Sequence, residues 1–551
     1  MKKNTKFIFV VGGVVSGIGK GTSVSSIALL LKARGFRVTA VKIDPYLNVD
    51  AGTMNPTEHG EVFVTIDGLE CDQDLGNYER FLDTDLSRAN YMTNGQVYLS
   101  VIEKERNLGY GGRCVEPVPH IPEEVIRRLE KAADINKAEF CIVEIGGTVG
   151  EYQSLMFLEA ARIMQRKHPG DILVVLVSYF PVPPSIGEMK SKPTQAAIRM
   201  LNEAGLQPDI VIGRSERPID DVRRRKVATN SNLDIEDVIS APDVKSIYDI
   251  PMNFENGGMT DRILAKAGLR SRRRDLKAWR QFVERGKTAQ RVVKIGVVGK
   301  YFGIGDFTLS DSYISVIEAI KHASSAEHAR HEITWVDAEK FEKDPKSVKE
   351  LAAFDGILVP GGFGARGVEG KIQAIRFARE KKKPYFGLCY GMQLATIEFA
   401  RHVLKLKGAH TTEVDVKSPH PVIDILPEQK KLMEKKEYGG TMRLGGYACS
   451  LEEKTLAHGA YKAFGKERMH GSVIQERHRH RFEFNNDYIK QFAKGGMVAS
   501  GTNPDRNLVE IMELKGHPFF LGTQFHPEFQ SRPLRPHPLF RAFVHACLRQ
   551  A

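Results

Sequence analysis

Cysteine is scarce in this chain, and its spacing excludes two classes of protein. The 551 residues include six cysteines, and none of them belongs to a C-x-x-C pair. Neither a disulfide framework nor a zinc site is therefore indicated, and a reducing, cytoplasmic setting is expected. The cysteines are Cys71, Cys114, Cys141, Cys389, Cys449 and Cys547.

Long apolar runs, internal repeats and low-complexity segments are also missing. No stretch reaches about 18 uninterrupted apolar residues, so no membrane span is expected. Met1-Lys2-Lys3 followed by the apolar residues 7–11 imitates an export signal. The apolar run breaks at Gly12-Gly13 and leads into a glycine-lysine loop, so a buried parallel strand explains it better.

Positive charge exceeds negative charge. Lys and Arg number 80 and Asp and Glu 68, which gives a net charge of +12 and favours anionic partners, either phosphorylated small molecules or nucleic acids. The densest basic run is residues 270–274. Because no aromatic residues are interleaved with it, we favour a solvated helix face over a nucleic-acid or lipid patch.

Short β-branched runs alternate with longer helical patterns, which predicts an α/β protein. The expected strands are residues 7–11, 38–43, 140–145, 172–177 and 210–212, then 292–299, 356–362, 385–389 and 519–526, with glycine turns at the ends of several of them. Strands separated by helices indicate two doubly wound, mostly parallel-sheet domains. We place the first domain at 1–268, a linker at 269–291 and the second domain at 292–551. The alternation of apolar strands and helices stops around Leu269 and gives way to an arginine-rich run.

Residues 12–22, G-G-V-V-S-G-I-G-K-G-T, follow an expected strand and open an expected helix. Backbone N–H groups there can cradle phosphate oxygens while Lys20 supplies a charge. The loop departs from the usual P-loop, because five residues separate Gly13 from Gly19 and Gly21 follows the lysine. A Mg²⁺-binding hydroxyl would have to come from Thr22, from Ser16 or from elsewhere. A glycine-rich turn without a ligand is the alternative.

Acidic residues strengthen the phosphate interpretation. Asp72-Gln73-Asp74 and Glu144, at the end of an expected strand, offer the hard oxygen ligands that Mg²⁺ requires. The segment 190–195, K-S-K-P-T-Q, adds two cations and an amide suited to a second polyphosphate and a base edge. A surface turn would explain the same composition.

The second half contains a nucleophile pattern. Residues 387–391, G-L-C-Y-G, have the form of a strand-to-helix elbow that exposes the thiol of Cys389 at a helix N-terminus. A buried structural cysteine is the alternative, but His526 and Glu528 follow a late strand and complete a Cys-His-Glu triad. Residues 361–364 offer backbone donors for an oxyanion hole. The expected chemistry is thiolate attack on an amide, a thioester and release of ammonia.

Three segments occur in an order that resembles the class I glutamine amidotransferases: P-G-G-F-G, G-L-C-Y-G-M-Q and Q-F-H-P-E. Six further segments extend the resemblance to the CTP synthase family over nearly the whole chain. They are G-G-V-V-S-G-I-G-K-G, K-I-D-P-Y-L-N-V-D-A-G-T-M-N-P, H-G-E-V-F-V, E-I-G-G-T-V-G, K-S-K-P-T-Q and E-R-H-R-H-R-F-E. The resemblance implies a P-loop-like synthetase domain followed by an amidotransferase domain.

The resemblance also implies the reaction. The first domain would use ATP to phosphorylate O4 of UTP, and ammonia made from glutamine in the second domain would displace the phosphate to give CTP. Mg²⁺ as cofactor, activation by GTP, inhibition by CTP, a homotetramer and filaments are implied as well. No nucleic-acid or membrane partner is expected.

Matching motifs assign roles to individual residues. ATP would contact Gly17, Ile18, Gly19, Lys20, Gly21, Thr22, Asp74, Arg214, Asp243 and Val244. UTP or CTP would contact Ser16, Glu151, Tyr152, Gln153, Lys190, Ser191, Lys192, Pro193, Thr194, Gln195 and Lys226. Glutamine would contact Gly362, Tyr390, Gly391, Met392, Gln393, Glu413 and Arg481. Asp74 and Glu144 would bind Mg²⁺, and Cys389, His526 and Glu528 would be catalytic.

The sequence departs from the family pattern at three places. Glu151-Tyr152-Gln153 stand where Asp-Ile-Glu usually contacts the cytidine of the inhibitor, which puts feedback by CTP in question. Tyr390 replaces a usual Leu beside the nucleophile, and Gly17 replaces a usual Ser in the phosphate loop.

Two rival interpretations remain at this point. An ATP-dependent amidoligase that aminates a carboxylate through an acyl phosphate would use the same two modules. A P-loop switch or filament-forming scaffold would use neither chemistry, but the intact Cys389, His526 and Glu528 argue against it. Because ammonia is mostly ammonium at neutral pH and is diluted in bulk water, a fused source and consumer suggest an enclosed passage.

Overall fold

The structure is a computed structural model that describes residues 5–55, 59–300, 310–425 and 442–550. Met1-Lys2-Lys3 lie outside the described residues. The chain forms two compact units, one of residues 1–50 and 74–283 and the other of 51–73 and 284–551. Within the described residues, no helix has both the length and the apolar character that crossing a membrane requires.

The first unit contains a seven-stranded sheet in the order β5-β2-β6-β1-β7-β8-β9. Every neighbouring pair in it is parallel. Its strands are β1 (Lys6–Gly12), β2 (Val38–Asp44), β5 (Tyr91–Thr93), β6 (Phe140–Ile145), β7 (Ile172–Tyr179), β8 (Ile210–Ser215) and β9 (Val238–Pro242). Strands β1 and β6 are almost completely buried, which explains why they read as continuous apolar runs.

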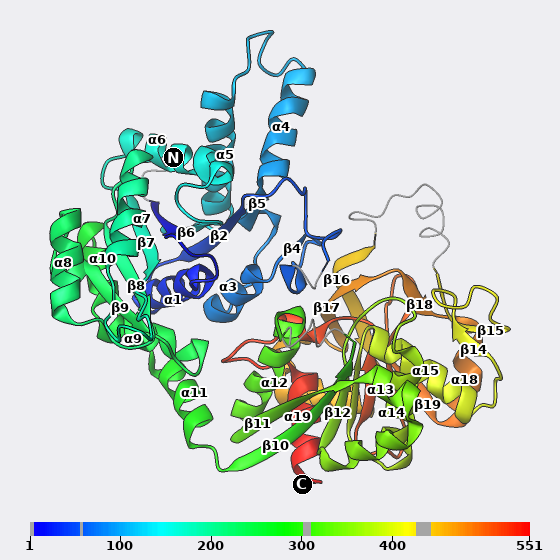
Figure 1. Ribbon diagram of the computed structural model, residues 1–551. Coiled ribbons are helices and arrows are strands. Elements are labelled where there is room, and N and C mark those ends of the chain that lie inside the picture. The colour runs from blue at the N-terminus through cyan, green and yellow to red at the C-terminus, as the bar shows by residue number, and fades with distance from the viewer. Residues whose placement is uncertain (1–4, 56–58, 301–309, 426–441, 551) are drawn as a thin grey trace. The chain divides into compact units, whose positions relative to one another are not determined.

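Helices cover both faces of this sheet (Figure 1). On one face α1 contacts β1, β2 and β6 and packs against α3 and α9. On the other face α4 to α8 share one hydrophobic core with alternate residues of β1 such as Phe7, Phe9 and Val11. The helices are α1 (Lys20–Ala33), α3 (Asp74–Leu82), α4 (Asn94–Arg106), α5 (Pro117–Ile135), α6 (Leu155–Lys167), α7 (Lys192–Glu203), α8 (Asp221–Ser231), α9 (Ile250–Asn256), α10 (Met259–Lys266) and α11 (Lys277–Thr288).

The second unit contains a nine-stranded sheet in the order β11-β10-β12-β13-β21-β20-β19-β16-β17. The first five strands in this order are parallel, and the remaining pairs are antiparallel. These strands are β10 (Arg291–Gly299), β11 (Ala329–Asp337), β12 (Gly356–Val359), β13 (Tyr385–Leu388), β16 (Arg443–Leu451), β17 (Val473–His480), β19 (Met497–Thr502), β20 (Val509–Leu514) and β21 (Phe520–Thr523). A small sheet of β14 (Ala409–Thr411), β15 (His420–Ile425) and β18 (Phe482–Phe484) accompanies it.

Two separate cores flank the nine-stranded sheet. Helices α12 (Ile314–Ala326), α17 (Leu456–Phe464) and α19 (Pro538–Leu548) pack on one side. Helices α13 (Ala338–Lys343), α14 (Val368–Glu380), α15 (Tyr390–His402) and α18 (Ile489–Gly495) pack on the other. The α/β prediction with two doubly wound sheets is therefore confirmed, with an antiparallel extension of the second sheet that the sequence did not indicate.

One segment of the first sequence half packs with the second unit. Residues 51–73 form a hairpin of β3 (Val62–Val64) and β4 (Glu70–Asp72). Arg477 of β17 donates to the carbonyl of Val64 at 3.1 Å, and Arg479 pairs with Glu70 at 2.8 Å. Packing therefore places residues 51–73 in the second unit, whereas the sequence alone put them in a first domain of residues 1–268.

The expected linker is largely structured. Helix α11 buries Trp279 and Phe282 against Leu29, Phe81 and Tyr248. The basic run that precedes it is anchored by ion pairs, because Arg272 binds Glu139 at 2.6 Å and Arg274 binds Glu255 at 2.6 Å. These intramolecular partners favour a structural role for at least part of the run.

Candidate active sites

The phosphate loop lies between β1 and α1 at the C-terminal edge of the first sheet, where parallel sheets place their ligands. Helix α1 begins at Lys20, directly after Gly19 in the left-handed conformation. Ser16 and Gly17 are exposed, while Ile18 is buried. Thr22 directs its hydroxyl to the carbonyl oxygen of Gly19 at 3.0 Å. Because α1 follows β1 through this loop, the N-terminus of α1 lies at the same edge of the sheet.

Lys20 is buried at this edge. Its Nζ donates to the carbonyl oxygen of Gly147 at 2.7 Å. Burial lowers the pKa of Lys20 below 10.5, although the Glu144 carboxylate acts in the opposite direction. Because the bonded partner is a neutral carbonyl, the ammonium group keeps its capacity to bind an anion.

Two carboxylates converge on a second lysine. Nζ of Lys42 binds Oδ2 of Asp74 and lies 2.8 Å from Oε1 of Glu144. The hydroxyl of Tyr78 donates to the other oxygen of Glu144. Burial raises the pKa of Glu144, while Lys42 acts to lower it. Asp74 and Glu144 therefore already share one cation.

This donor set fits Mg²⁺. Both side chains offer hard carboxylate oxygens, and the shared Lys42 ammonium shows that the pair can hold a cation between them. No group of three or more His, Cys, Asp or Glu side chains suited to a metal occurs among the described residues. A Mg²⁺ ion bound by Asp74 and Glu144 alone would complete its coordination with water and phosphate oxygens, as Mg²⁺ commonly does.

Several other predicted nucleotide contacts reach the same edge. Arg214, near the end of β8, lies beside Gly19 and binds Asp243 at 2.9 Å. Ser178, near the end of strand β7, donates to the hydroxyl of Thr194 at 2.9 Å and lies close to Gly13. The 190–195 segment is thus next to the phosphate loop. Ser191 precedes α7 without a side-chain capping hydrogen bond, and Lys190 binds Glu188.

The remaining predicted nucleotide contacts are less closely tied to this edge. Glu151 accepts from the N–H and hydroxyl of Thr148 at 3.0 and 2.6 Å and contributes to the electrostatic field at Lys20. Tyr152 is 88% exposed. Lys226 is exposed on α8. Lys192, Pro193 and Gln195 lie in the first turn of α7, and Val244 follows Asp243.

The sequence analysis missed Lys42 and Tyr78 as site residues. Lys42 is a buried charge within the apolar strand β2, and that contrast was the available signal. Tyr78 carries no such signal, because a buried tyrosine in a helix is ordinary.

The nucleophile elbow is present in the second unit. Cys389 lies between β13 and α15 with φ +48° and ψ −98°, a strained conformation for a residue with a side chain. Its thiol lies 3.9 Å from the carbonyl oxygen of Arg479 and accepts from Nε2 of Gln524 at 3.7 Å. Strain at this position is typical of a cysteine held for chemistry rather than for packing.

His526 and Glu528 complete the triad. Nδ1 of His526 lies 2.7 Å from Oε1 of Glu528. Burial lowers the pKa of His526, but attraction to Glu528 and to Cys389 outweighs it and raises that pKa to about 10. A Cβ atom on Gly361 would lie 2.9 Å from Cε1 of His526 and 3.8 Å from Cβ of Cys389, so the glycine loop packs against both. The neighbouring carboxylate therefore favours the protonated form of this imidazole.

A cavity of about 310 Å³ adjoins the thiol. Gly362, Phe363 and Arg481 line it together with the triad, and Met54 and Val62 line it from the 51–73 segment. Its size falls in the range of small-molecule sites. The arrangement can hold an amide beside a cysteine nucleophile.

The other predicted glutamine contacts surround this cavity or support it. The N–H of Gly364 donates to Glu413 at 2.6 Å, and Tyr390 donates to the carbonyl of Gly364 at 3.0 Å. Gln393 donates to the carbonyl of Phe482 at 2.9 Å. Gly391 and Met392 begin α15 inside the core. Arg479 and Gln524, which contact the thiol, were not singled out from the sequence.

Comparison with known proteins shows which family the chain resembles. The family described as "CTP synthase N-terminus" matches residues 6–269, and "Glutamine amidotransferase class-I" matches 308–546. The CTP synthase of Rubrobacter xylanophilus is 51% identical over 99% of this chain and 96% of its own length. That of Thermococcus kodakarensis is 50% identical over 99% of both chains.

A solved structure also resembles part of the chain. It is the CTP synthase glutaminase domain of Trypanosoma brucei with bound acivicin, 35% identical over 47% of this chain and 94% of that one, with a TM-score of 0.42. The two family matches cover residues 6–269 and 308–546, and the relatives align with the chain nearly end to end. The chain therefore belongs to the CTP synthase family.

Proposed function

We propose that this chain divides the synthesis of CTP between its two units, with glutamine hydrolysis at Cys389 and amination of UTP at the Lys20 loop. It is a ligase that converts UTP to CTP with ATP and with nitrogen from glutamine. The observation that carries the assignment of residues is the strained Cys389 elbow beside a histidine whose pKa is raised to about 10.

At the glutaminase site the thiolate of Cys389 attacks the carboxamide carbon of glutamine. The S–C bond forms, and backbone donors of the 361–364 loop stabilise the oxyanion. His526 gives its proton to the amide nitrogen as the C–N bond breaks and ammonia leaves. Water, deprotonated by His526, then cleaves the thioester and releases glutamate. Glu528 orients the imidazole throughout.

At the synthetase site the terminal phosphoryl group of ATP is transferred to O4 of UTP. Phosphate is a better leaving group than oxide, so ammonia can attack C4 and expel it. Lys20 and the N-terminus of α1 would bind the triphosphate, and Arg214 with Asp243 would border the adenine nucleotide. Asp74 and Glu144 would hold Mg²⁺, which supplies positive charge for phosphoryl transfer when bound.

Regulation and assembly belong to the same proposal and rest on the resemblance to the family. GTP would activate the enzyme, CTP would inhibit it, and the chains would form homotetramers and filaments. The departure at 151–153 predicts altered inhibition by CTP, because Glu151 is engaged by Thr148.

The test is an assay of CTP formation with UTP, ATP and Mg²⁺, supplied either with glutamine or with ammonium chloride. The proposal requires a 4-amino pyrimidine product with both nitrogen sources. An enzyme that consumes glutamine and ATP but aminates a carboxylate instead of UTP would overturn it.

A further inference from the structure

The backbone of β17 touches both reacting residues of the glutaminase site. The carbonyl oxygen of Arg479 lies 3.9 Å from the thiol of Cys389. The carbonyl oxygen of Arg477 accepts from the N–H of His526 at 2.8 Å. The position of the β17 backbone therefore affects where Cys389 lies relative to His526.

His480, the last residue of β17, is bonded at the same corner. Its Nδ1 lies 3.2 Å from the carbonyl oxygen of Phe482, which also accepts from Gln393. A carbonyl oxygen can only accept, so Nδ1 carries the hydrogen and Nε2 of a neutral His480 must accept. That Nε2 lies 2.9 Å from Nδ1 of His478, which therefore donates. His478 thus donates to His480, and His480 donates to the carbonyl of Phe482.

The next group along is a carboxyl. Nε2 of His478 faces Oε2 of Glu510 at 3.6 Å. With Nδ1 of His478 donating, Nε2 presents a lone pair, and a lone pair facing an ionised carboxylate would be repulsive. A proton on Glu510 removes that repulsion.

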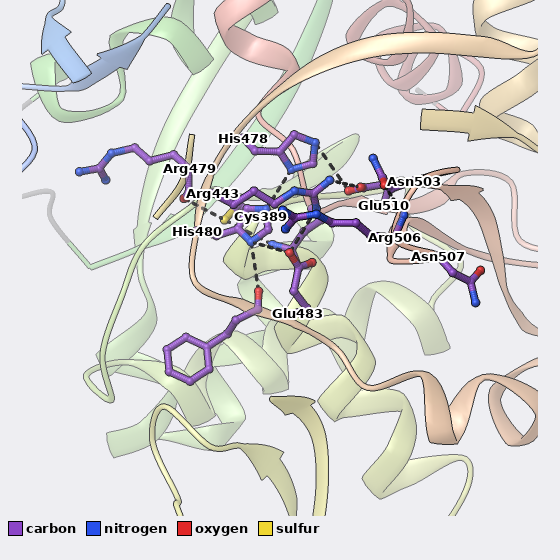
Figure 2. A network of polar contacts seen from close by, with 12 residues as sticks. Cys389, Arg443, His478, Arg479, His480, Glu483, Asn503, Arg506, Asn507 and Glu510 are labelled. Atoms are coloured by element: carbon purple, nitrogen blue, oxygen red, sulfur yellow. Dashed lines mark hydrogen bonds and ion pairs between the residues drawn. The ribbon is translucent and has the colours of Figure 1, made fainter. Parts of the chain in front are cut away.

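The charges around Arg443 lead to the same conclusion. Its guanidinium binds Glu510 at 2.6 Å and Glu483 at 3.1 Å. Figure 2 shows these three side chains gathered with His478 and His480, and all five are at most 3% exposed. Arg443 is the buried cation between these two carboxylates, while Arg506, the other cation that acts on Glu483, is exposed to solvent. The buried part of the cluster therefore carries more negative than positive charge, which is costly without a proton.

The pKa directions agree with a shared proton. Burial raises the pKa of Glu483 to about 8 and also raises that of Glu510, while it lowers the pKa of His478 and His480. Arg506 lowers the pKa of Glu483, and the charge of His526 lowers those of both imidazoles. The two histidines are thus neutral, and the glutamates are the groups that retain the proton.

We propose that Arg443, His478, His480, Glu483 and Glu510 form a positioning network for the glutaminase site, in which the two glutamates share one proton and the two imidazoles transmit one direction of hydrogen bonding to the carbonyl of Phe482. Arg479 lies on the opposite side of the strand and points away from this network (Figure 2). The network acts through β17, and none of its five residues lines the cavity beside the thiol. It rests on the proposed function only in taking Cys389 as the nucleophile.

The first test replaces His480 in the full chain. His480→Phe removes the donor to Phe482 and is expected to lower glutamine-dependent kcat by more than about tenfold, with KM for glutamine and ammonia-dependent synthesis changed by less than about threefold. His480→Asn keeps an N–H near Nδ1 and should retain at least about a third of the activity. His458→Phe, at a half-buried site outside the network, is the matched control.

The outcomes separate the proposal from a purely structural role. Equal loss of both synthetic activities in His480→Phe, or equal loss in His480→Phe and His480→Asn, would overturn the donor role. Glutamine-dependent activity that survives Cys389→Ala would instead overturn the proposed function. Normal activity of His480→Phe beside an inactive Cys389→Ala would overturn the network alone.

The second test addresses the shared proton. Gln resembles a protonated carboxyl, because its amide can donate to His478 while its oxygen accepts from Arg443. Glu510→Gln should therefore keep glutamine-dependent kcat within about threefold, whereas Glu510→Ala should lower it more than about tenfold. Loss of the same size in both variants would contradict a proton at this position.

Discussion

A Cβ atom placed on Gly21 would lie 2.2 Å from Oδ1 of Asp74. The glycine after Lys20 therefore permits the aspartate to approach the first turn of α1. Ser or Thr, the usual residue at this position of a P-loop, would displace it. The departure from the common pattern therefore leaves room for the Asp74 carboxylate where a side-chain hydroxyl would otherwise lie.

Gly21→Ala is expected to push Asp74 out of position and to lower CTP synthesis by more than about tenfold with either nitrogen source, while glutamine hydrolysis continues. The matched control is Gly286→Ala in α11, where a Cβ would meet no atom within 4 Å. Normal synthesis by Gly21→Ala would contradict the role given to Asp74.

Lys20→Ala should lower synthesis from both glutamine and ammonia by more than about a hundredfold, because the ammonium group would bind transferred phosphate. Steady-state assays with both nitrogen sources measure this. Lys131→Ala, which removes an exposed lysine on α5, should have no effect. Survival of the ammonia reaction in Lys20→Ala would count against a phosphate-binding role.

Glu528→Gln should lower glutamine-dependent kcat by about 10² to 10⁴-fold, because the oriented carboxylate holds the imidazole in place. The change also removes the largest attraction that raises the pKa of His526 toward 10. The imidazolium is then lost at lower pH, so the alkaline decline of glutaminase activity should shift to lower pH. A profile that stays in place would show that another group holds this pKa up.

Lys371 provides a test of pH-dependent stability. It is 1% exposed beneath the ring of Tyr390, and burial lowers its pKa to about 7. In the unfolded chain the group titrates near 10.5, so the folded protein loses stability as pH falls from about 10.5 to about 7. Below that range the full cost, on the order of a few kcal/mol, is present.

Lys371→Met should therefore raise the apparent unfolding temperature at pH 7, and the gain should shrink as pH approaches 10. Thermal unfolding at several pH values measures it, with the exposed Lys381→Met as control. A gain that does not depend on pH would indicate improved packing rather than removal of a buried charge.

Continuous apolar runs predicted most of the parallel strands of both sheets, because such strands are buried on both faces. The parallel strands β5, β9 and β11 were not predicted. Strand β6 occupies the expected residues, and β10 differs by one residue at its start. The antiparallel half of the second sheet was not predicted. Strand β17 reads V-I-Q-E-R-H-R-H, and its charged side chains are buried by partners that come from distant parts of the chain.

The triad could be predicted because each member follows a strand in a short recognisable pattern. Lys42 gave only one signal, its charge within an apolar strand. Its role could not be predicted, because its partners Asp74 and Glu144 lie 32 and 102 residues away. The assignment of residues 51–73 also depends on tertiary contacts, such as those of Arg477 and Arg479. Local pattern does not contain this information.

Two separable sites in one chain are the central claim, and Cys389→Ala tests it most directly. CTP formation should be measured with glutamine and with ammonium chloride at the same UTP, ATP and Mg²⁺ concentrations. We predict that glutamine-dependent synthesis falls by more than about a thousandfold while ammonia-dependent synthesis stays within about twofold of the unmodified enzyme. Equal loss of both activities, or persistence of the glutamine reaction, would contradict the account.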